Sequence, residues 1–220
     1  MDYFLEGCCT CPGDAVTARH SGAARIELCE QLEIGGVTPS EALLRETLDA
    51  LAEDAQGTPC IKVNVLVRPR GGDFVYGASE VARMMADIEL CKHIPGVNGV
   101  VIGALRPDGS IDTDTMRRLL AAARSPEGHA LEVTFHRAFD VCADIDSALE
   151  DIIGLGCERI LTSGHAPDAF QGRFTLRHLV RQAAGRIIIL AGGGIRPHNI
   201  AEIAAVSHAP EYHSSTLTGW

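Results

Sequence analysis

Charged residues and glycines follow an apolar, valine-rich segment at residues 61–67, in the order Arg68-Pro69-Arg70-Gly71-Gly72-Asp73. Alternate residues of a β-strand share a face, so Arg68 falls on the same face as Lys62 and Asn64, opposite the valines. Such a strand fits the wall of a barrel with a polar interior. Because a guanidinium can bind a carboxylate or phosphate through two parallel hydrogen bonds, we expect Arg68 and Arg70 to hold an anionic ligand.

Ionisable side chains occupy the same strand face in three other apolar segments, as Glu6, Glu27 and His136. Charged groups are seldom fully buried unless they are paired, so we expect these residues to meet Arg68 in one polar cavity. There His136, with Glu6 or Glu27, would transfer protons, and Arg68 would bind the substrate. The alternative is an internal salt-bridge network that fills the barrel without catalysis.

A glycine run, Gly192-Gly193-Gly194, and the pair Ser214-Ser215 end the last two predicted strands. Barrel enzymes often bind phosphate in the loops after strands seven and eight, and backbone N–H groups in such turns form anion nests. We therefore expect these residues, with Ser163 at the end of the sixth strand, to bind an anion. A tight turn that requires positive φ explains the glycines equally well.

Two cysteines, Cys8 and Cys29, lie on adjacent predicted strands and on the same face as Glu6 and Glu27. Neighbouring strands are about 4.8 Å apart, so the two sulfurs can approach each other. A pair of thiolates is a soft ligand set that suits Cu(I), which makes these cysteines candidate copper ligands. The alternative is that each is a small buried apolar residue.

The elements that must position these side chains alternate between short β-rich segments and amphipathic helical segments. This order produces parallel strands with right-handed crossovers. Even spacing and polar residues on one strand face favour an α/β fold of the (β/α)8 TIM-barrel type over a doubly wound open sheet. We predict a single domain over residues 1–220, with the eighth helix missing or replaced by a short tail. Strands are expected near 3–9, 25–30, 61–68, 99–105, 131–137, 159–163, 187–191 and 211–215, and helices near 14–22, 40–54, 79–93, 112–124, 144–155, 173–184 and 197–206.

The composition excludes several classes of partner. The formal net charge of −10 argues against a nucleic-acid or anionic-membrane surface. The first residues lack the basic and apolar regions of a signal peptide, and no apolar run reaches the roughly 18 residues of a membrane span. We therefore expect a cytoplasmic protein whose eight cysteines are thiols rather than a disulfide framework.

Seven segments in order along the chain resemble the CutC copper-homeostasis family. They are Ala24-Arg25-Ile26-Glu27-Leu28-Cys29, Gly35-Gly36-Val37-Thr38-Pro39-Ser40, Arg68-Pro69-Arg70-Gly71-Gly72-Asp73-Phe74, Thr134-Phe135-His136-Arg137-Ala138-Phe139-Asp140, Arg159-Ile160-Leu161-Thr162-Ser163-Gly164, Gly192-Gly193-Gly194 and His213-Ser214-Ser215. The resemblance implies a (β/α)8 barrel, a cytoplasmic location, homo-oligomers and Cu(I) binding by Cys8 and Cys29. The family's polar strand ends correspond to Glu6, Glu27, Arg68, Arg70, Asp73, His136, Arg137, Asp140 and His213.

The chain departs from the family pattern at Gly7, Ala24 and Ile34, where the family usually has a bulky apolar residue, Asp and Glu, and the tail after Ser215 is short. A barrel edge without its eighth helix would expose apolar strand faces, so we expect a second subunit to cover it in a homodimer. Two functions stay open at this point. One is copper handling by the two cysteines, and the other is acid–base catalysis on a small anionic or phosphorylated substrate at the barrel mouth.

Overall fold

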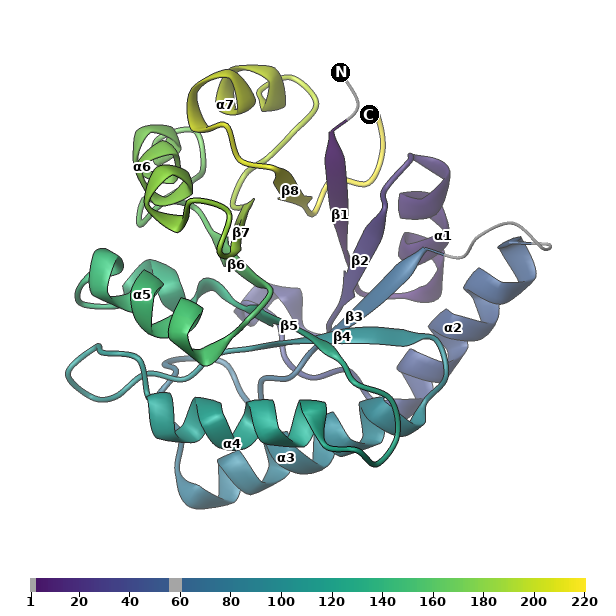
Figure 1. Cartoon of the computed structure of the whole chain (residues 1–220). Helices are drawn as coiled ribbons and strands as arrows, with labels where there is room; N and C mark the ends of the chain where they lie inside the picture. The colour runs from purple at the N-terminus through teal and green to yellow at the C-terminus, as the bar shows by residue number, and fades with distance from the viewer. Residues whose placement is uncertain (1–2, 56–60) are drawn as a thin grey trace.

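The computed structural model describes residues 3–55 and 61–220, which form a closed barrel of eight parallel strands in sequence order. Helices surround the strands, and the C-terminal tail lies beside the start of β1 (Figure 1). The strands are β1 (Phe4–Cys9), β2 (Arg25–Leu28), β3 (Lys62–Leu66), β4 (Val97–Ile102), β5 (Glu132–Phe135), β6 (Arg159–Thr162), β7 (Ile188–Ala191) and β8 (Glu211–Ser214). The TIM-barrel prediction is confirmed.

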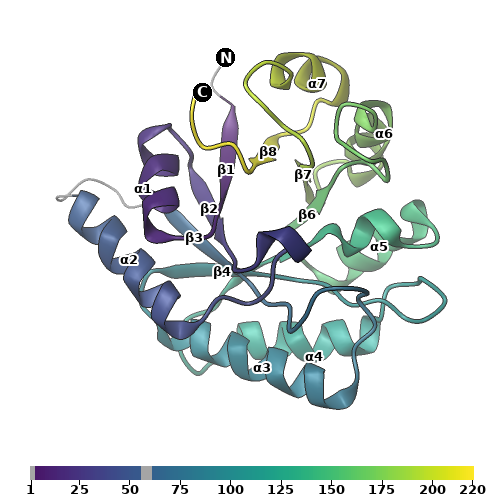
Figure 2. The ribbon, with the colours of Figure 1, turned by 180° about the vertical axis from the view of Figure 1, so that it is seen from behind.

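Within the described residues, seven α-helices follow the first seven strands, as the alternation predicted. They are α1 (Pro12–His20), α2 (Glu41–Ala55), α3 (Ala78–His93), α4 (Thr113–Arg124), α5 (Ile145–Leu155), α6 (Arg173–Ala183) and α7 (Ile200–Ser207). Helix α7 begins three residues later than expected, because Pro197 lies in a turn in which Asn199 Oδ1 accepts a hydrogen bond from the Arg196 N–H. Two 3₁₀ segments were not predicted, η1 (Leu32–Ile34) and η2 (Arg137–Val141). Segment η1 crosses in front of the strands in Figure 2.

Strand alternation separates the side chains that pack beneath the helices from those that point into the barrel interior. In β3, Val63 and Val65 are buried in the main core beneath the helices, and Asn64 between them is buried on the opposite face. Each strand of the ring pairs with its two neighbours, and β8 pairs with β1 to close it. Closure leaves no free sheet edge, and it brings the first and last segments of the chain together.

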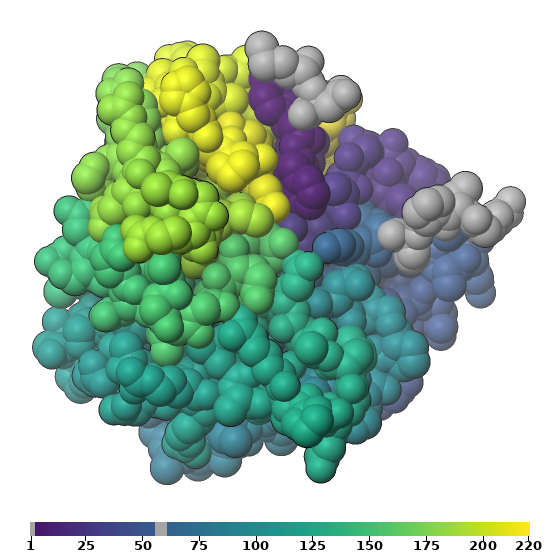
Figure 3. Space-filling model, viewed as in Figure 1, coloured from purple at the N-terminus to yellow at the C-terminus, as the bar shows by residue number. Residues whose placement is uncertain are grey.

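After β8, residues 215–220 continue without a helix. Leu217 and Trp220 pack against the main core, and the Trp220 indole donates a hydrogen bond to the Thr216 carbonyl. A Cβ atom at Gly7 would lie 2.9 Å from Ala18 Cβ and 3.0 Å from Leu217 Cδ2, so the glycine allows α1 and the tail to approach β1. Figure 3 shows the yellow C-terminal residues beside the purple first strand.

The expected exposure of apolar strand faces at this edge is not observed. Leu5 of β1 and Tyr212 of β8 are buried within the chain itself, and Tyr212 packs edge-on against Tyr3. The argument that an open edge requires a second subunit was therefore wrong, because the tail and the aromatic pair cover that edge. Homodimer formation stays a prediction without this support.

The described residues include no helix that is both long enough and apolar enough to cross a membrane.

Candidate functional site

The lower part of the barrel interior is filled by a chain of ion pairs. Arg25 of β2 pairs with Glu6 of β1 and with Glu211 of β8. Arg159 of β6 pairs with the same Glu211 and with Glu132 of β5. Four of these five residues are buried, and Glu132 is partly buried. An internal salt-bridge network therefore exists at the floor of the barrel, but of the four residues expected to form one it contains only Glu6.

The residues of this floor were missed as a site, although the sequence carried a signal for them. Arg25 and Glu27 lie two positions apart on one strand, as do Glu211 and His213, so the period of two places all four inward. We predicted a site only at the carboxyl ends of the strands. Inspection of the inward-facing residues at the start of each strand would have revealed the network.

Above this floor a cavity of about 320 Å³ opens at the carboxyl ends of the strands. Barrel enzymes place their active sites at this end. The lining residues named in the sequence analysis are Cys8, Glu27, Cys29, Arg68, His136, Arg137, Gly193, Gly194, His213 and Ser215, joined by Leu32, Gly35, Leu66, Phe74 and Leu161. Glu27, Arg68 and His136 thus share one cavity.

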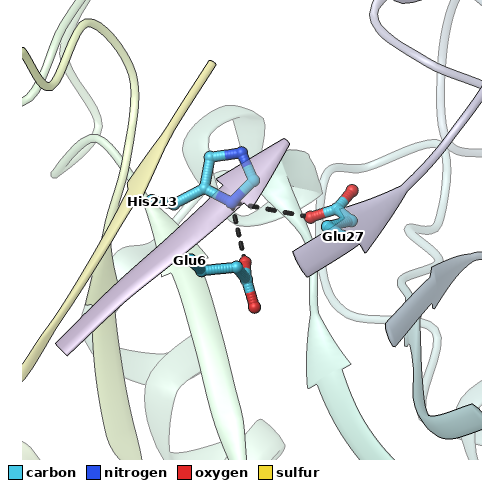
Figure 4. Close-up of side chains that lie close together, drawn as sticks. All are labelled: Glu6, Glu27 and His213. Carbon is cyan, nitrogen blue, oxygen red and sulfur yellow. Dashed lines mark hydrogen bonds and ion pairs between the residues drawn. The ribbon is translucent and has the colours of Figure 1, made fainter. Parts of the chain in front are cut away.

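Between the floor and the cavity, Glu6, Glu27 and His213 form a cluster, shown in Figure 4. The His213 Nδ1 atom lies 2.7 Å from Glu6 Oε1 and 3.8 Å from Glu27 Oε2. The other oxygen of Glu6 accepts a hydrogen bond from Arg25. Glu27 Oε2 is buried and makes no hydrogen bond with the described residues. His213 was predicted only as an anion-binding residue, and its contact with two carboxylates is new.

The three members of the cluster have shifted pKa values of different sign. Burial alone would raise the pKa of Glu6, but the hydrogen bond with His213 and the charge of Arg25 lower it to about 2. Burial raises the pKa of Glu27 to about 7 against the opposing charge of His213. Burial favours neutral His213, yet the hydrogen bond to Glu6 and the charges of Glu27 and Glu6 raise its pKa. Two buried carboxylates and one imidazole therefore titrate as a linked group.

The thiols of Cys8 and Cys29 meet at the wall of the cavity. Their Sγ atoms are 3.9 Å apart, and both side chains pack with Leu66 and Val101 in a small apolar cluster. The hydrogen bond to Cys29, burial and the nearby charge of Glu27 raise the pKa of the Cys8 thiol well above its ordinary value. Without a metal the Cys8 side chain is therefore a neutral thiol at physiological pH.

His136 immediately precedes η2 and is its N-cap residue. Its Nδ1 atom accepts a hydrogen bond from the Ala138 N–H, so the ring proton resides on Nε2. Burial, and after it the charge of Arg68, lower the pKa of His136 to about 3. The Nε2 atom is buried and has no hydrogen-bond partner among the described residues. His136 is therefore a neutral side chain with an unused donor, and its part in proton transfer stays a prediction.

Arg68 uses its terminal nitrogens to hold two mouth loops together. Its Nη1 atom donates to the carbonyls of Gly36 and Ile34, and its Nη2 atom donates to the carbonyl of Gly72. The guanidinium also stacks 4.8 Å from the centre of the Phe74 ring. The Nε atom is buried without an acceptor in the part of the chain that the structure describes. The terminal nitrogens of Arg68, which we expected to bind an anion, therefore donate hydrogen bonds to backbone carbonyls instead.

Arg70 and Asp73 lie outside the cavity lining. Arg70 pairs with Asp73 and with Glu80 of α3, and it donates to three carbonyls, those of Gly71, Asp73 and Val75. Asp73 is exposed. These contacts fold the loop between β3 and α3, and the structure does not bring either residue to the other predicted anion ligands.

Arg137 lines the cavity and is oriented by its neighbours. It pairs with Asp140, and its Nη2 atom donates to the Ser163 hydroxyl. Asp140 in turn accepts hydrogen bonds from the backbone N–H groups of Ser163 and His165. Asp140 and Ser163 therefore connect the loops after β5 and β6, and Arg137 is the member of this group that reaches the cavity.

The glycine run after β7 forms a tight turn at the rim. Gly193 has φ of 91°, which favours glycine, and a Cβ there would lie in tight contact, 3.1 Å from Ser163 Cβ. Gly193 and Gly194 line the cavity, whereas Gly192 does not. Ser214 donates to the Ile195 carbonyl and supports the loop, while Ser215 reaches the cavity. The tight-turn interpretation is confirmed, and anion binding by this turn stays a prediction.

Comparison with known proteins adds independent information. A model of the CutC family matches residues 3–218. A CutC family protein of Parabacteroides distasonis is 47% identical over 215 residues, which cover 98% of this chain and 83% of the relative. Another, from Histophilus somni, is 46% identical over 214 residues, covering 97% of this chain and 82% of the relative.

Among solved structures, a CutC protein of Streptococcus agalactiae, provisionally named for copper homeostasis, is 30% identical. Its structure superimposes with a TM-score of 0.88 over 99% of this chain and 100% of that protein. A family match over nearly the whole chain, relatives above 40% identity and a shared barrel agree. The chain belongs to the CutC family.

Proposed function

We propose that this protein binds Cu(I) through Cys8 and Cys29 and takes part in copper homeostasis in the cytoplasm. The observation that supports the proposal is the 3.9 Å separation of the two sulfurs at the wall of an open cavity. A metal–thiolate bond of the zinc type is about 2.3 Å long, so one ion can contact both sulfurs without any movement of the backbone. The reducing cytoplasm keeps such thiols available for a soft metal.

The surroundings of the two sulfurs fit a soft monovalent ion. Leu66 and Val101 supply an apolar wall, which favours thiolate–copper bonding over binding of a strongly hydrated cation. Because the Cys8 pKa is raised, copper has to displace a proton, and its affinity rises with pH. The cavity supplies an open route for the ion to arrive and leave.

The test is an anaerobic Cu(I) titration against a coloured competing chelator. The control is Cys142→Ser/Cys157→Ser, which removes two buried cysteines that do not line the cavity. Wild type and control should each bind one Cu(I) tightly. In Cys8→Ser/Cys29→Ser the affinity for Cu(I) should fall by more than about 100-fold. Changes to groups that only support metal ligands lower metal affinity by about 10–100-fold, so a larger loss identifies the ligands themselves. Unchanged tight binding in Cys8→Ser/Cys29→Ser would contradict the proposal.

A second candidate function is binding, and acid–base conversion, of a small carbonyl or anionic compound. The supporting observation is the pair of unused buried donors, His136 Nε2 and Arg68 Nε, on residues that line one cavity in the described part of the chain. Donors fixed in a water-poor site stabilise charge that develops on a substrate oxygen. Glu27 lines the same cavity and supplies the carboxylate for proton transfer.

A thermal-shift screen with carboxylated and phosphorylated metabolites tests this candidate. A ligand should raise the melting temperature of the wild type and of Asp73→Asn, whose side chain lies outside the cavity. His136→Asn keeps an acceptor for the η2 N-cap but loses the Nε2 donor, so its shift should disappear. The absence of any shift across the screen would count against a small-molecule substrate.

A further inference from the structure

We propose that Glu6, Glu27 and His213 form a metal site for a divalent first-row cation of the Mn²⁺ class, separate from the thiol pair. The three residues come from β1, β2 and β8, which closure of the barrel makes adjacent. Each offers one ligand atom, and these atoms all lie within 4.8 Å of one another. Glu6 and Glu27 precede Cys8 and Cys29 by two residues on the same strand face, and Glu27 lies beside Cys8 in the register of β1 and β2.

The separations within the cluster fit a shared ion. Carboxylate oxygen and imidazole nitrogen bind first-row metals at about 2.1 Å, so two ligands of one ion are at most about 4.2 Å apart. The distances from His213 Nδ1 to Glu6 Oε1, 2.7 Å, and to Glu27 Oε2, 3.8 Å, both satisfy this limit. In Figure 4 both carboxylates face the same ring nitrogen. The ligand atoms of the whole cluster lie within 4.8 Å of one another, so the two carboxylates have to come within about 4.2 Å of each other when an ion binds.

The Glu27 carboxylate carries a second observation that points to a missing ligand. The residue is 5% exposed, and its Oε2 atom makes no hydrogen bond with any described residue. A buried oxygen without a partner is costly, and buried charges are usually paired or bound to a metal. An ion between Glu27, Glu6 and His213 would supply that partner.

Arg25 and Glu211 support the cluster in the way that outer hydrogen-bond partners support the ligands of known metal sites. Arg25 donates to the oxygen of Glu6 that does not face His213, and Arg25 is itself held by Glu211. Outer partners of this kind orient a ligating carboxylate and tune its charge.

The donor set also indicates which ion would bind. Two carboxylates and one imidazole are harder ligands than the thiols of Cys8 and Cys29, and they suit Mn²⁺ or Fe²⁺ rather than Cu(I). Glu27 and His213 line the cavity, so the remaining coordination positions open towards it. Water or a ligand oxygen can occupy those positions, as in catalytic metal sites.

The experiment is a titration of the metal-free protein with Mn²⁺, in which loss of the free-ion electron paramagnetic resonance signal reports binding. Wild type and Cys8→Ser/Cys29→Ser should each bind one Mn²⁺. Glu27→Gln, which keeps the side-chain shape, should bind at least tenfold more weakly. Glu33→Gln is the matched control, since Glu33 is an exposed carboxylate of η1 near the mouth, and it should bind as the wild type does.

Circular dichroism of each variant establishes that it is folded. If Glu27→Gln does not fold, His213→Gln takes its place, and the same tenfold loss is expected. The proposal is overturned by no Mn²⁺ binding at millimolar concentration, or by equal binding in the folded ligand variant and the wild type. Loss of binding in Cys8→Ser/Cys29→Ser also overturns it, because the ion would then belong to the thiols. A parallel Cu(I) titration keeps the two sites distinguishable, since failure of either leaves the other result intact.

Discussion

Cys8 lies beside Glu27 in the register of β1 and β2, so its sulfur reaches the Cys29 sulfur diagonally, at 3.9 Å. Inward side chains of neighbouring barrel strands meet in this staggered way because the strands tilt around the barrel axis. The stagger places a carboxylate and a thiol side by side at the cavity wall. The proposed copper site at Cys8 and Cys29 is therefore a direct neighbour of the proposed divalent-metal site at Glu6, Glu27 and His213.

Thiol reactivity should separate Cys8 from Cys11. The pKa of Cys8 is raised by its hydrogen bond to Cys29 and by burial, whereas Cys11 is exposed at the start of α1. Since the thiolate is the nucleophile, iodoacetamide at pH 8 should modify Cys11 and leave Cys8 unmodified in the folded, metal-free protein. Peptide mass spectrometry measures both rates. In denaturant the two should react alike, and equally fast modification in the native state would show that Cys8 is not protected.

Acidification should destabilise the protein because of His136. Its folded pKa of about 3 lies below the ordinary value of 6.5, so between these values the unfolded chain binds one more proton than the folded protein. The free energy of unfolding should therefore decrease as the pH falls from 6.5 towards 3, with a slope of up to about 1.4 kcal/mol per pH unit from this residue. Urea unfolding of wild type and His136→Asn between pH 7 and 4 measures the slope.

The slope, rather than the absolute stability, is the readout for His136. Asparagine keeps the N-cap acceptor but does not titrate, so His136→Asn should show the flatter pH profile. Parallel profiles for the two proteins would mean that His136 is already accessible to protons in the folded barrel.

Removal of Arg25 should destabilise the barrel floor strongly. Its side chain is fully buried and pairs with both Glu6 and Glu211, so Arg25→Met leaves Glu6 with only His213 and Glu211 with only Arg159 to offset their buried charges. The expected loss is about 3–5 kcal/mol of unfolding free energy. Arg186→Met, which breaks an exposed pair with Glu150, should leave the urea midpoint almost unchanged. If Arg25→Met unfolds at the wild-type midpoint, the floor network does not stabilise the protein.

Two glycines should respond to alanine in opposite directions. Gly193 has φ of 91° and Ser163 Cβ within 3.1 Å of a new Cβ, so Gly193→Ala should cost about 1–3 kcal/mol. Gly154 lies inside α5 with open space around it, and Gly154→Ala should stabilise the protein by about 0.5–1 kcal/mol. Chemical denaturation compares them. A neutral Gly193→Ala would mean that the rim turn adjusts freely.

Much of the site followed from the alternation of residues along single strands. The period of two predicts that Cys8, Glu27 and Arg68 point into the barrel, and all three line the cavity. The acceptors of Arg68 could not be predicted, because they are carbonyls of Ile34, Gly36 and Gly72, and backbone groups carry no sequence signature. The same holds for the Gly7 contact with Leu217, which depends on the path of the tail.

The amino-acid sequence by itself determined the strand–helix order, the inward face of each strand and the family to which the chain belongs, because these depend on local periodicity and motif. Only the tertiary structure decided that His213 contacts Glu6, across 207 residues of sequence, and that Arg25 joins Glu6 to Glu211. Such contacts depend on how the ring closes and how far neighbouring strands are staggered, and both are set by packing of the whole barrel rather than by any one segment.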